Sequence, residues 1–324
     1  MHTLLLVLSV LLLVPGSAFA FWLLRRFGGW TWCRHLHLLV LSVPLVSLGV
    51  NLLAVNHFVG RTCFTTAPSW DILLSLLIAL SMGLIVMAGI GLGVFRQLLL
   101  HLVVARKARP AGADLQLLIT RLAAALRVTT PRTLLYATQS PLALTYGIIH
   151  PTMVLSPWMV DQLDPRELEA VLAHELAHIA RRDALIGWLA QLLRDAFCYV
   201  PTSWVAYRDL QHEKELASDD LALQLTHRPL GLVSALAKVW QATVRMPTFS
   251  TGSTLVGMGS SIESRITRLL YPQVQANEVL PTQWQSLGSV LLALLGLVII
   301  EAVMMAILLA PMGCGPLASL GGMW

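Results

Sequence analysis

One stretch of the chain limits its possible folds more than any other feature. Residues 72–95 contain no charged side chain, and Asp71 and Arg96 bound them. A helix needs about 20 mostly apolar residues to cross the hydrocarbon core of a bilayer, and this stretch meets that length. Hydrophobic residues make up 56% of the 324-residue chain and charged residues only 12%, which excludes an ordinary soluble domain. We therefore expect an integral membrane protein.

Other apolar runs of similar length occur near both ends of the chain. The last of them is interrupted only by Glu301, which we expect either to pair with an arginine or to couple a signal through the membrane. The expected organisation is a multi-pass membrane protein with these parts in chain order: 1–95, three transmembrane helices at about 3–24, 38–55 and 72–95; 96–284, a more polar domain; 285–310, a fourth transmembrane helix; and 311–324, a short tail.

Lysine and arginine in short loops mark the cytoplasmic side of a membrane protein. They follow the first and third runs and precede the fourth, whereas the loop between the second and third runs carries only Arg61. The residues that set this bias are Arg25, Arg26, Arg34, Arg96, Arg106, Lys107, Arg109, Arg265 and Arg268. The bias predicts a cytoplasmic domain at 96–284 and an extracytoplasmic tail at 311–324. It also explains the net charge of +5, so we expect no direct nucleic-acid binding.

The end of the first run, residues 17–20 with the sequence SAFA, is similar to a signal-peptidase site. Cleavage there would remove the first span and move the central domain across the membrane, against the charge bias. The residues before the apolar core also lack lysine and arginine. We therefore favour an uncleaved helix.

Residues 164–183 begin with a clear helix signal. Asp164 can cap the helix, Pro165 suits its first position, and Glu167 completes a capping box. An apolar stripe follows at helical spacing, formed by Leu168, Leu172, Leu176 and Ile179. The pattern predicts a helix that packs against the rest of its domain.

His174 and His178 lie one turn apart on another face of this helix, so two imidazoles can reach one ion. Zinc accepts nitrogen ligands tetrahedrally and leaves a position for water when one more protein ligand is supplied. Glu175, between the histidines, is then placed to take a proton from that water. The alternative is an HExxH pattern that arose by chance, but the capped helix and a downstream carboxylate favour the metal site.

That carboxylate is expected in residues 213–220, EKELASDD, where Glu213 and Glu215 are the candidates. A glutamate as third ligand gives a two-histidine, one-glutamate catalytic site. A solvated helix face is the simpler interpretation of this stretch, and we consider it the minor one.

HELAH at 174–178 followed by ELASD at 215–219 resembles the HExxH and ExxxD pair of the integral-membrane gluzincins. The resemblance implies that Glu215 is the third zinc ligand, with Glu213 its rival, and that Asp219 supports a histidine ligand. The order of spans resembles the BlaR/MecR-type antirepressor peptidases, although we expect no penicillin-binding sensor domain of their kind within residues 1–324. The implied fold is mainly α, with a helical zinc-metallopeptidase domain and a small β-sheet (α+β) between transmembrane helices 3 and 4.

Further segments fit the same family. Residues 140–156 are similar to the segment that forms strands beside the active site, and 264–270, SRITRLL, to the motif that closes the catalytic domain. Tyr146 and His150 are candidates for stabilising an oxyanion, although turn and packing roles are favoured. Residues 184–207 are apolar but contain two charged residues, and we interpret them as an amphipathic or membrane-skimming segment rather than a fifth span.

The resemblance implies a zinc-dependent endopeptidase of the cell membrane with its active site on the cytoplasmic side. Its substrate is expected to be a protein or peptide in extended form against a strand near 142–146. The first hypothesis is regulated proteolysis in signal transduction, by cleavage of a transcriptional repressor or of the chain itself. The second is membrane-protein quality control of the HtpX type. A non-catalytic signalling scaffold is the third, and four intact site residues argue against it.

Overall fold

The computed structural model describes residue 41, residues 69–245 and residues 262–271. Several predictions fall wholly or almost wholly outside the described residues, namely the spans at 3–24, 38–55 and 285–310, the tail at 311–324, Glu301 and the cleavage site at 17–20.

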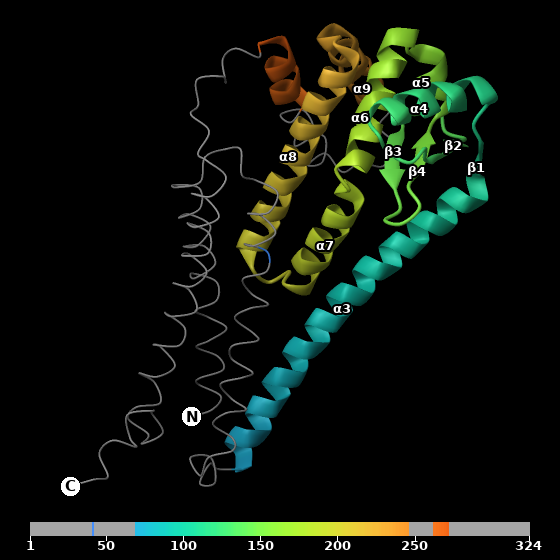
Figure 1. Ribbon diagram of the computed structural model, residues 1–324. Coiled ribbons are helices and arrows are strands. Elements are labelled where there is room, and N and C mark those ends of the chain that lie inside the picture. Colours follow the sequence, from blue (N-terminus) through green and yellow to red (C-terminus); the bar gives the residue numbers. More distant parts are fainter. Residues whose placement is uncertain (1–40, 42–68, 246–261, 272–324) are drawn as a thin grey trace. The chain divides into compact units, whose positions relative to one another are not determined.

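The described part of the chain is mainly helical with one small sheet (Figure 1). Its helices are α3 (Ser69–Lys107), α4 (Ala113–Ala125), α5 (Pro157–Gln162), α6 (Pro165–Ala180), α7 (Asp183–Ala196), α8 (Pro201–Thr226) and α9 (Pro229–Arg245), with a further helix at 262–270. The strands are β1 (Ala108–Pro110), β2 (Arg132–Tyr136), β3 (Ala143–Tyr146) and β4 (Thr152–Leu155). This confirms the predicted fold class of helices with a small sheet, whereas the multi-pass arrangement stays a prediction.

The chain divides into two compact units. One comprises residues 1–94, 190–210 and 280–324, and the other comprises 95–189 and 211–279. The sheet, both zinc-motif segments and the helix at 262–270 belong to the second unit. The candidate site can therefore be described within one unit.

Helix α3 contains Gly83–Val104, which is long and apolar enough to cross a membrane, and this is the one such helix in the described residues. The window lies later than the expected 72–95, because the helix continues through Arg96 into further apolar residues. A single arginine does not end a helix, since its helix propensity is high. Large apolar side chains of α3 are exposed along its length, as a lipid-facing helix requires; they include Leu73, Leu77, Leu80, Leu84, Met87, Leu92, Phe95, Leu98 and Leu102.

Within the first unit, α3 and the end of α7 approach each other closely. A Cβ atom at Gly89 would overlap the carbonyl oxygen of Asp195, and one at Gly93 would lie 2.9 Å from the Leu192 side chain. Glycine at these two positions therefore admits a neighbouring helix that a larger residue would exclude. Residues 184–207 contain almost all of α7 and the first turns of α8, and no candidate span lies there. The amphipathic or membrane-skimming interpretation stays a prediction.

The sheet has the strand order β1-β2-β4-β3. Strands β2 and β4 are parallel, while β1 pairs antiparallel with β2 and β3 antiparallel with β4. The strands β3 and β4 fall within 140–156, where the family resemblance implied them. Strand β3 ends this order, so one of its edges faces away from the sheet.

Alternate residues of a strand point to opposite faces of a sheet, and here the two faces meet different helices. Tyr146 and Val154 pack with Val104 from the end of α3. Met153 and Leu155 pack on the other face, in the core that includes residues of α4 and α6. The sheet therefore separates the last turns of α3 from the helix that carries the HExxH motif.

Helix α6 begins as the sequence predicts. The Asp164 carboxylate accepts hydrogen bonds from the backbone N–H groups of Arg166 and Glu167, both at 2.9 Å, and the Glu167 carboxylate accepts one from the Asp164 N–H at 2.9 Å. Leu172 and Leu176 are fully buried in the core against the sheet. The capping box and the apolar stripe are both confirmed, and together they fix how α6 presents its other face.

Candidate metal centre

Two histidine rings of α6 meet at one place. The Nε2 atoms of His174 and His178 lie 3.2 Å apart, and the ring planes stand at 88° to each other. His174 is buried and His178 partly buried. The helical spacing thus brings two nitrogen donors together, as expected from residues one turn apart.

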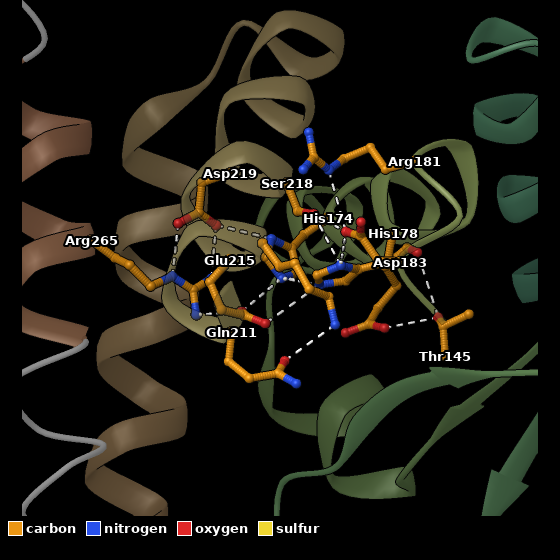
Figure 2. A network of polar contacts seen from close by, with 12 residues as sticks. Thr145, His174, His178, Arg181, Asp183, Gln211, Glu215, Ser218, Asp219 and Arg265 are labelled. Carbon is orange, nitrogen blue, oxygen red and sulfur yellow. Dashed lines mark hydrogen bonds and ion pairs between the residues drawn. The ribbon is translucent and has the colours of Figure 1, made fainter. Parts of the chain in front are cut away.

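Glu215 of α8 brings a carboxylate to the same place (Figure 2). Its Oε2 lies 3.4 Å from Nε2 of His174, and its Oε1 lies 3.7 Å from Nε2 of His178. Within the described residues, these three side chains are the group found to offer ligand atoms that all lie within 4.8 Å of one another. The rival Glu213 is not a member of this group.

The spacing of these donor atoms fits one zinc ion. Zn–N and Zn–O bonds of about 2.0–2.2 Å in tetrahedral geometry place two ligand atoms about 3.3–3.6 Å apart. The separations of 3.2, 3.4 and 3.7 Å lie close to that range. Two imidazoles and one carboxylate are also the donor set of a catalytic zinc site, with a fourth position left for a water or substrate oxygen.

Asp219, one turn after Glu215 on α8, contacts His174 from the far side of its ring. Its Oδ1 lies 2.9 Å from Nδ1 of His174. Arg265 donates to both oxygens of Asp219 at 2.7 Å, and its Nη1 lies 3.0 Å from Oε2 of Glu215. One guanidinium therefore binds both the candidate third ligand and the carboxylate behind the first histidine.

These contacts shift the pKa values of the groups involved. Burial alone lowers the pKa of His174, but the carboxylates of Asp219 and Glu215 outweigh it and raise that pKa to about 9. Burial alone raises the pKa of Glu215, but the contact with His174 and the charges of His178 and Arg265 hold it well below its ordinary value. Glu215 is thus ionised at neutral pH, as a cation ligand must be.

His178 has a carboxylate of its own, from Asp183 at the start of α7. The Nδ1 of His178 lies 2.9 Å from Oδ2 of Asp183, which also accepts from Arg181 Nε at 3.3 Å and from the Ser218 hydroxyl at 3.4 Å. Burial alone raises the pKa of Asp183, but the hydrogen bond from His178 and the charge of Arg181 hold it below its ordinary value. An ionised Asp183 keeps the proton on Nδ1, which turns the Nε2 lone pair toward the centre.

The carboxylate of Glu175 is buried between α6 and the edge strand β3. The Thr145 hydroxyl donates a hydrogen bond to Oε2 of Glu175 at 2.9 Å. This bond fixes the orientation of the Glu175 carboxylate. The group predicted as the base is therefore held by the sheet as well as by its own helix.

The sequence prediction did not include Asp183, Arg265 or Thr145 as site residues. Asp183 had a local signal, because a carboxylate five residues after His178 can fold back to its ring when the helix ends between them. Thr145 and Arg265 lie 30 residues or more from their partners in the chain. No local pattern indicates such contacts.

Three other residues considered from the sequence have different surroundings. Burial raises the pKa of Glu213 to about 8, so this carboxyl is mostly neutral at neutral pH and a poor cation ligand. Tyr146 is buried against α3, which supports a packing role. His150 is exposed in the loop between β3 and β4.

Comparison with known proteins gives a family and several relatives. The model of the BlaR1 peptidase M56 family matches residues 42–269, more than two thirds of the chain. Protease HtpX homolog 2 of Methanosarcina mazei is 28% identical over 164 residues, which cover 40% of this chain and 56% of that protein. Regulatory protein BlaR1 of Bacillus licheniformis is 30% identical over 89 residues, covering 28% of this chain and 15% of that protein.

A protease HtpX homolog of Moorella thermoacetica is 27% identical over 207 residues, covering 51% of this chain and 69% of that protein. The chain thus matches about half the length of the first relative and a small part of BlaR1. The family match includes both zinc motifs and the segment of Arg265, and it confirms the resemblance inferred from HELAH and ELASD. The chain belongs to the BlaR1 peptidase M56 family.

Proposed function

We propose that this chain is a membrane-bound zinc metallopeptidase that hydrolyses peptide bonds. The observation that carries the proposal is the convergence of His174, His178 and Glu215, with Glu175 on the same helix between the two histidines and its carboxylate bound by the Thr145 hydroxyl. Membership of a peptidase family and the protease names of the relatives support it.

The proposed chemistry assigns one role to each side chain. His174, His178 and Glu215 hold the metal, which supplies Lewis acidity that polarises a carbonyl and lowers the pKa of water. Glu175 accepts the proton of the attacking water and delivers it to the leaving amine. Asp219 and Asp183 hold the histidine rings in the orientation and tautomer that ligation needs.

Strand β3 is the proposed platform for substrate. It is the last strand of the sheet, and it carries the Thr145 hydroxyl that contacts Glu175. An extended peptide that pairs with the outer edge of β3 would pass beside the proposed base. Backbone pairing of this kind accepts many sequences, because it uses groups that every residue has.

The proposed location is the cell membrane, with several spans and the site on the cytoplasmic side. The apolar window Gly83–Val104 and the overall composition support the membrane location. The excess of lysine and arginine in the segments that flank the central domain supports its placement on the cytoplasmic side.

The test of the proposed chemistry is Glu175→Gln, in purified full-length protein. The variant should keep stoichiometric zinc by elemental analysis and lose about 10²–10⁴-fold in cleavage of a casein-type peptide substrate, because the amide cannot accept the proton. Glu169→Gln on the same helix is the matched control, since Glu169 pairs with an exposed arginine instead. Equal cleavage by the Glu175→Gln variant and the wild type would refute the proposal.

For the physiological role, we propose regulated proteolysis of a protein substrate, with a transcriptional repressor or the chain itself as target. The similarity to a regulatory protein supports this role. Similarity to several HtpX homologues favours quality control of membrane proteins as a second candidate. Comparison of the proteomes of wild-type and Glu175→Gln cells separates them: one or few stabilised proteins indicate regulation, and many unrelated membrane proteins indicate quality control. Unchanged signalling in the variant would indicate a scaffold.

A further inference from the structure

The short loop between β3 and β4 carries two exposed apolar side chains at its tip. Ile149 is 83% exposed and Ile148 48% exposed. Loop tips that face water are mostly built from Gly, Pro, Asn, Asp and Ser, because these residues satisfy turn geometry and stay hydrated. The two adjacent isoleucines form a small exposed apolar patch at this tip.

The loop keeps its shape through its backbone. Gly147 has a φ of +94°, a conformation that residues with a side chain rarely adopt. A Cβ atom at this position would also overlap the carbonyl oxygen of His150. The strand pairing of Tyr146 with Thr152 closes the loop at its base. The two isoleucines are therefore not needed as core residues that hold the turn together.

The base of the loop lies against α3. The rings of Tyr146 and His101 meet edge to face at 5.6 Å, and Tyr146 also belongs to the same core cluster as Val104. Both α3 residues lie within the apolar window Gly83–Val104. In Figure 1 the loop between β3 and β4 points toward α3.

The surface of α3 at this level includes several exposed leucines. Leu98 is 55% exposed, and Leu99 and Leu102 are 48% and 46% exposed. Ile149 is three residues beyond Tyr146, so it lies within about 10 Å of the α3 contact. The helix ends with Arg106 and Lys107, cations of the kind found at the level of lipid headgroups.

We propose that the tip formed by Ile148 and Ile149 enters the interface of the lipid bilayer beside α3. The tip is a second membrane contact of the domain, and it holds β3 and its Thr145 hydroxyl at a fixed height above the lipid. The occupant is the bilayer because the exposed tip adjoins the helix window that is apolar enough to span it. The inference rests on the proposed membrane location and does not require peptidase activity.

Depth-dependent fluorescence quenching tests the proposal in the full-length, zinc-loaded protein. The four native cysteines are replaced by alanine, and a single cysteine is introduced by Ile149→Cys. It is labelled with nitrobenzoxadiazole, and the protein is reconstituted in phosphatidylcholine–phosphatidylglycerol vesicles that contain doxyl lipids. Leu117→Cys on α4, 73% exposed, is the matched control for an exposed apolar residue, and Leu92→Cys in the apolar window is the control for lipid contact.

The label at 149 should emit at shorter wavelength than the label at 117, resist aqueous iodide and be quenched by doxyl lipids at a depth of about 5–10 Å from the headgroup boundary. Iodide quenching at 149 equal to that at 117 overturns the proposal. Protection from both quenchers also overturns it, because the tip is then covered by protein. Loss of lipid quenching at 92 refutes the membrane location itself. Ile148→Cys repeats the measurement at a second position, in case the label at 149 prevents folding.

Discussion

Each candidate histidine ligand is held by a carboxylate of its own. Asp219 lies behind His174 and Asp183 behind His178, each 2.9 Å from the ring Nδ1. Arginines bind both carboxylates, Arg265 at Asp219 and Arg181 at Asp183. Paired in this way, the carboxylates stay ionised and contact both rings at their Nδ1 atoms.

The role of Asp183 leads to the first residue-scale prediction. Asp183→Ala should weaken zinc binding by about 10–100-fold, because His178 then loses the group that fixes its tautomer and orientation. Competition with a fluorescent chelator measures the affinity. Asp161→Ala, an exposed aspartate on α5, should leave the affinity unchanged. Wild-type affinity in the Asp183→Ala variant would show that His178 needs no such support.

Two glutamates of α8 give a matched pair. Glu215→Gln should lose stoichiometric zinc after dialysis, because a neutral amide is a weak ligand and Arg265 stays beside it. Glu213→Gln should retain zinc, because its carboxyl is held largely neutral by burial and lies outside the ligand group. The reverse result would assign the third ligand to Glu213.

The metal ligands could be proposed from the sequence because two of them lie one helical turn apart. The choice of Glu215 over Glu213 needed the family pattern, since spacing alone allows both. Arg265 could not be assigned a role, because its carboxylate partners are about 50 residues away and the sequence does not say which helix faces it. Long-range ion pairs of this kind follow from tertiary packing alone.

At the scale of elements, helix α6 depends on one buried carboxylate. Besides capping the helix, Glu167 accepts hydrogen bonds from Ser234 and Lys238 of α9, at 2.5 and 2.6 Å. Burial alone raises the pKa of Glu167, but these donors outweigh it and hold the pKa below its ordinary value. The Glu167 carboxylate thus both caps the start of α6 and binds α9 to it.

Glu167→Gln should destabilise the domain by about 1–3 kcal/mol at neutral pH, because it weakens the cap and removes the charge that pairs with Lys238. A carboxyl with a lowered pKa stabilises the fold above its unfolded-state value and loses that effect as the pH falls through the lowered pKa. The difference in stability between wild type and variant should therefore shrink as the pH falls below the ordinary glutamate value of about 4.3 toward the lowered pKa of Glu167. Thermal unfolding in detergent at several pH values measures the stability difference, with Glu169→Gln as the control variant. A gap independent of pH would contradict this account.

The start of α6 was predictable because its signals lie within four residues. The end of α3 and the order of the strands were not. The charge of Arg96 predicts the end of a span at residue 95. An isolated arginine nevertheless continues a helix almost as readily as leucine does, because the helix propensities of the two residues are similar. The placement of β4 between β2 and β3 depends on which faces the helices cover, and local patterns do not contain that information.

At the scale of the molecule, the proposed metal joins α6 to α8, two helices that contribute ligands from about 40 residues apart in the chain. Removing it with a chelator should lower the melting temperature, since a ligand at 1,000 times its Kd stabilises the fold by about 4 kcal/mol. Glu175→Gln should show the same shift, because it keeps all ligands, and His174→Ala should show none. If the chelator leaves the melting temperature of the wild type unchanged, the protein does not bind a stabilising metal.

The side chains of the adjacent residues Thr145 and Tyr146 lie on opposite faces of the sheet. Thr145 contacts the proposed base Glu175, and Tyr146 packs against α3. If the connection at 137–142 gained or lost one residue and β3 slid one place along β4, each side chain would turn to the other layer. The side chain of Leu144 or Tyr146, depending on the direction of the shift, would then stand where the Thr145 hydroxyl now meets Glu175. The length of the connection at 137–142 thus sets the register of β3 and with it the residue that contacts the proposed base. We expect a single-residue insertion there to abolish activity while every metal ligand stays in place.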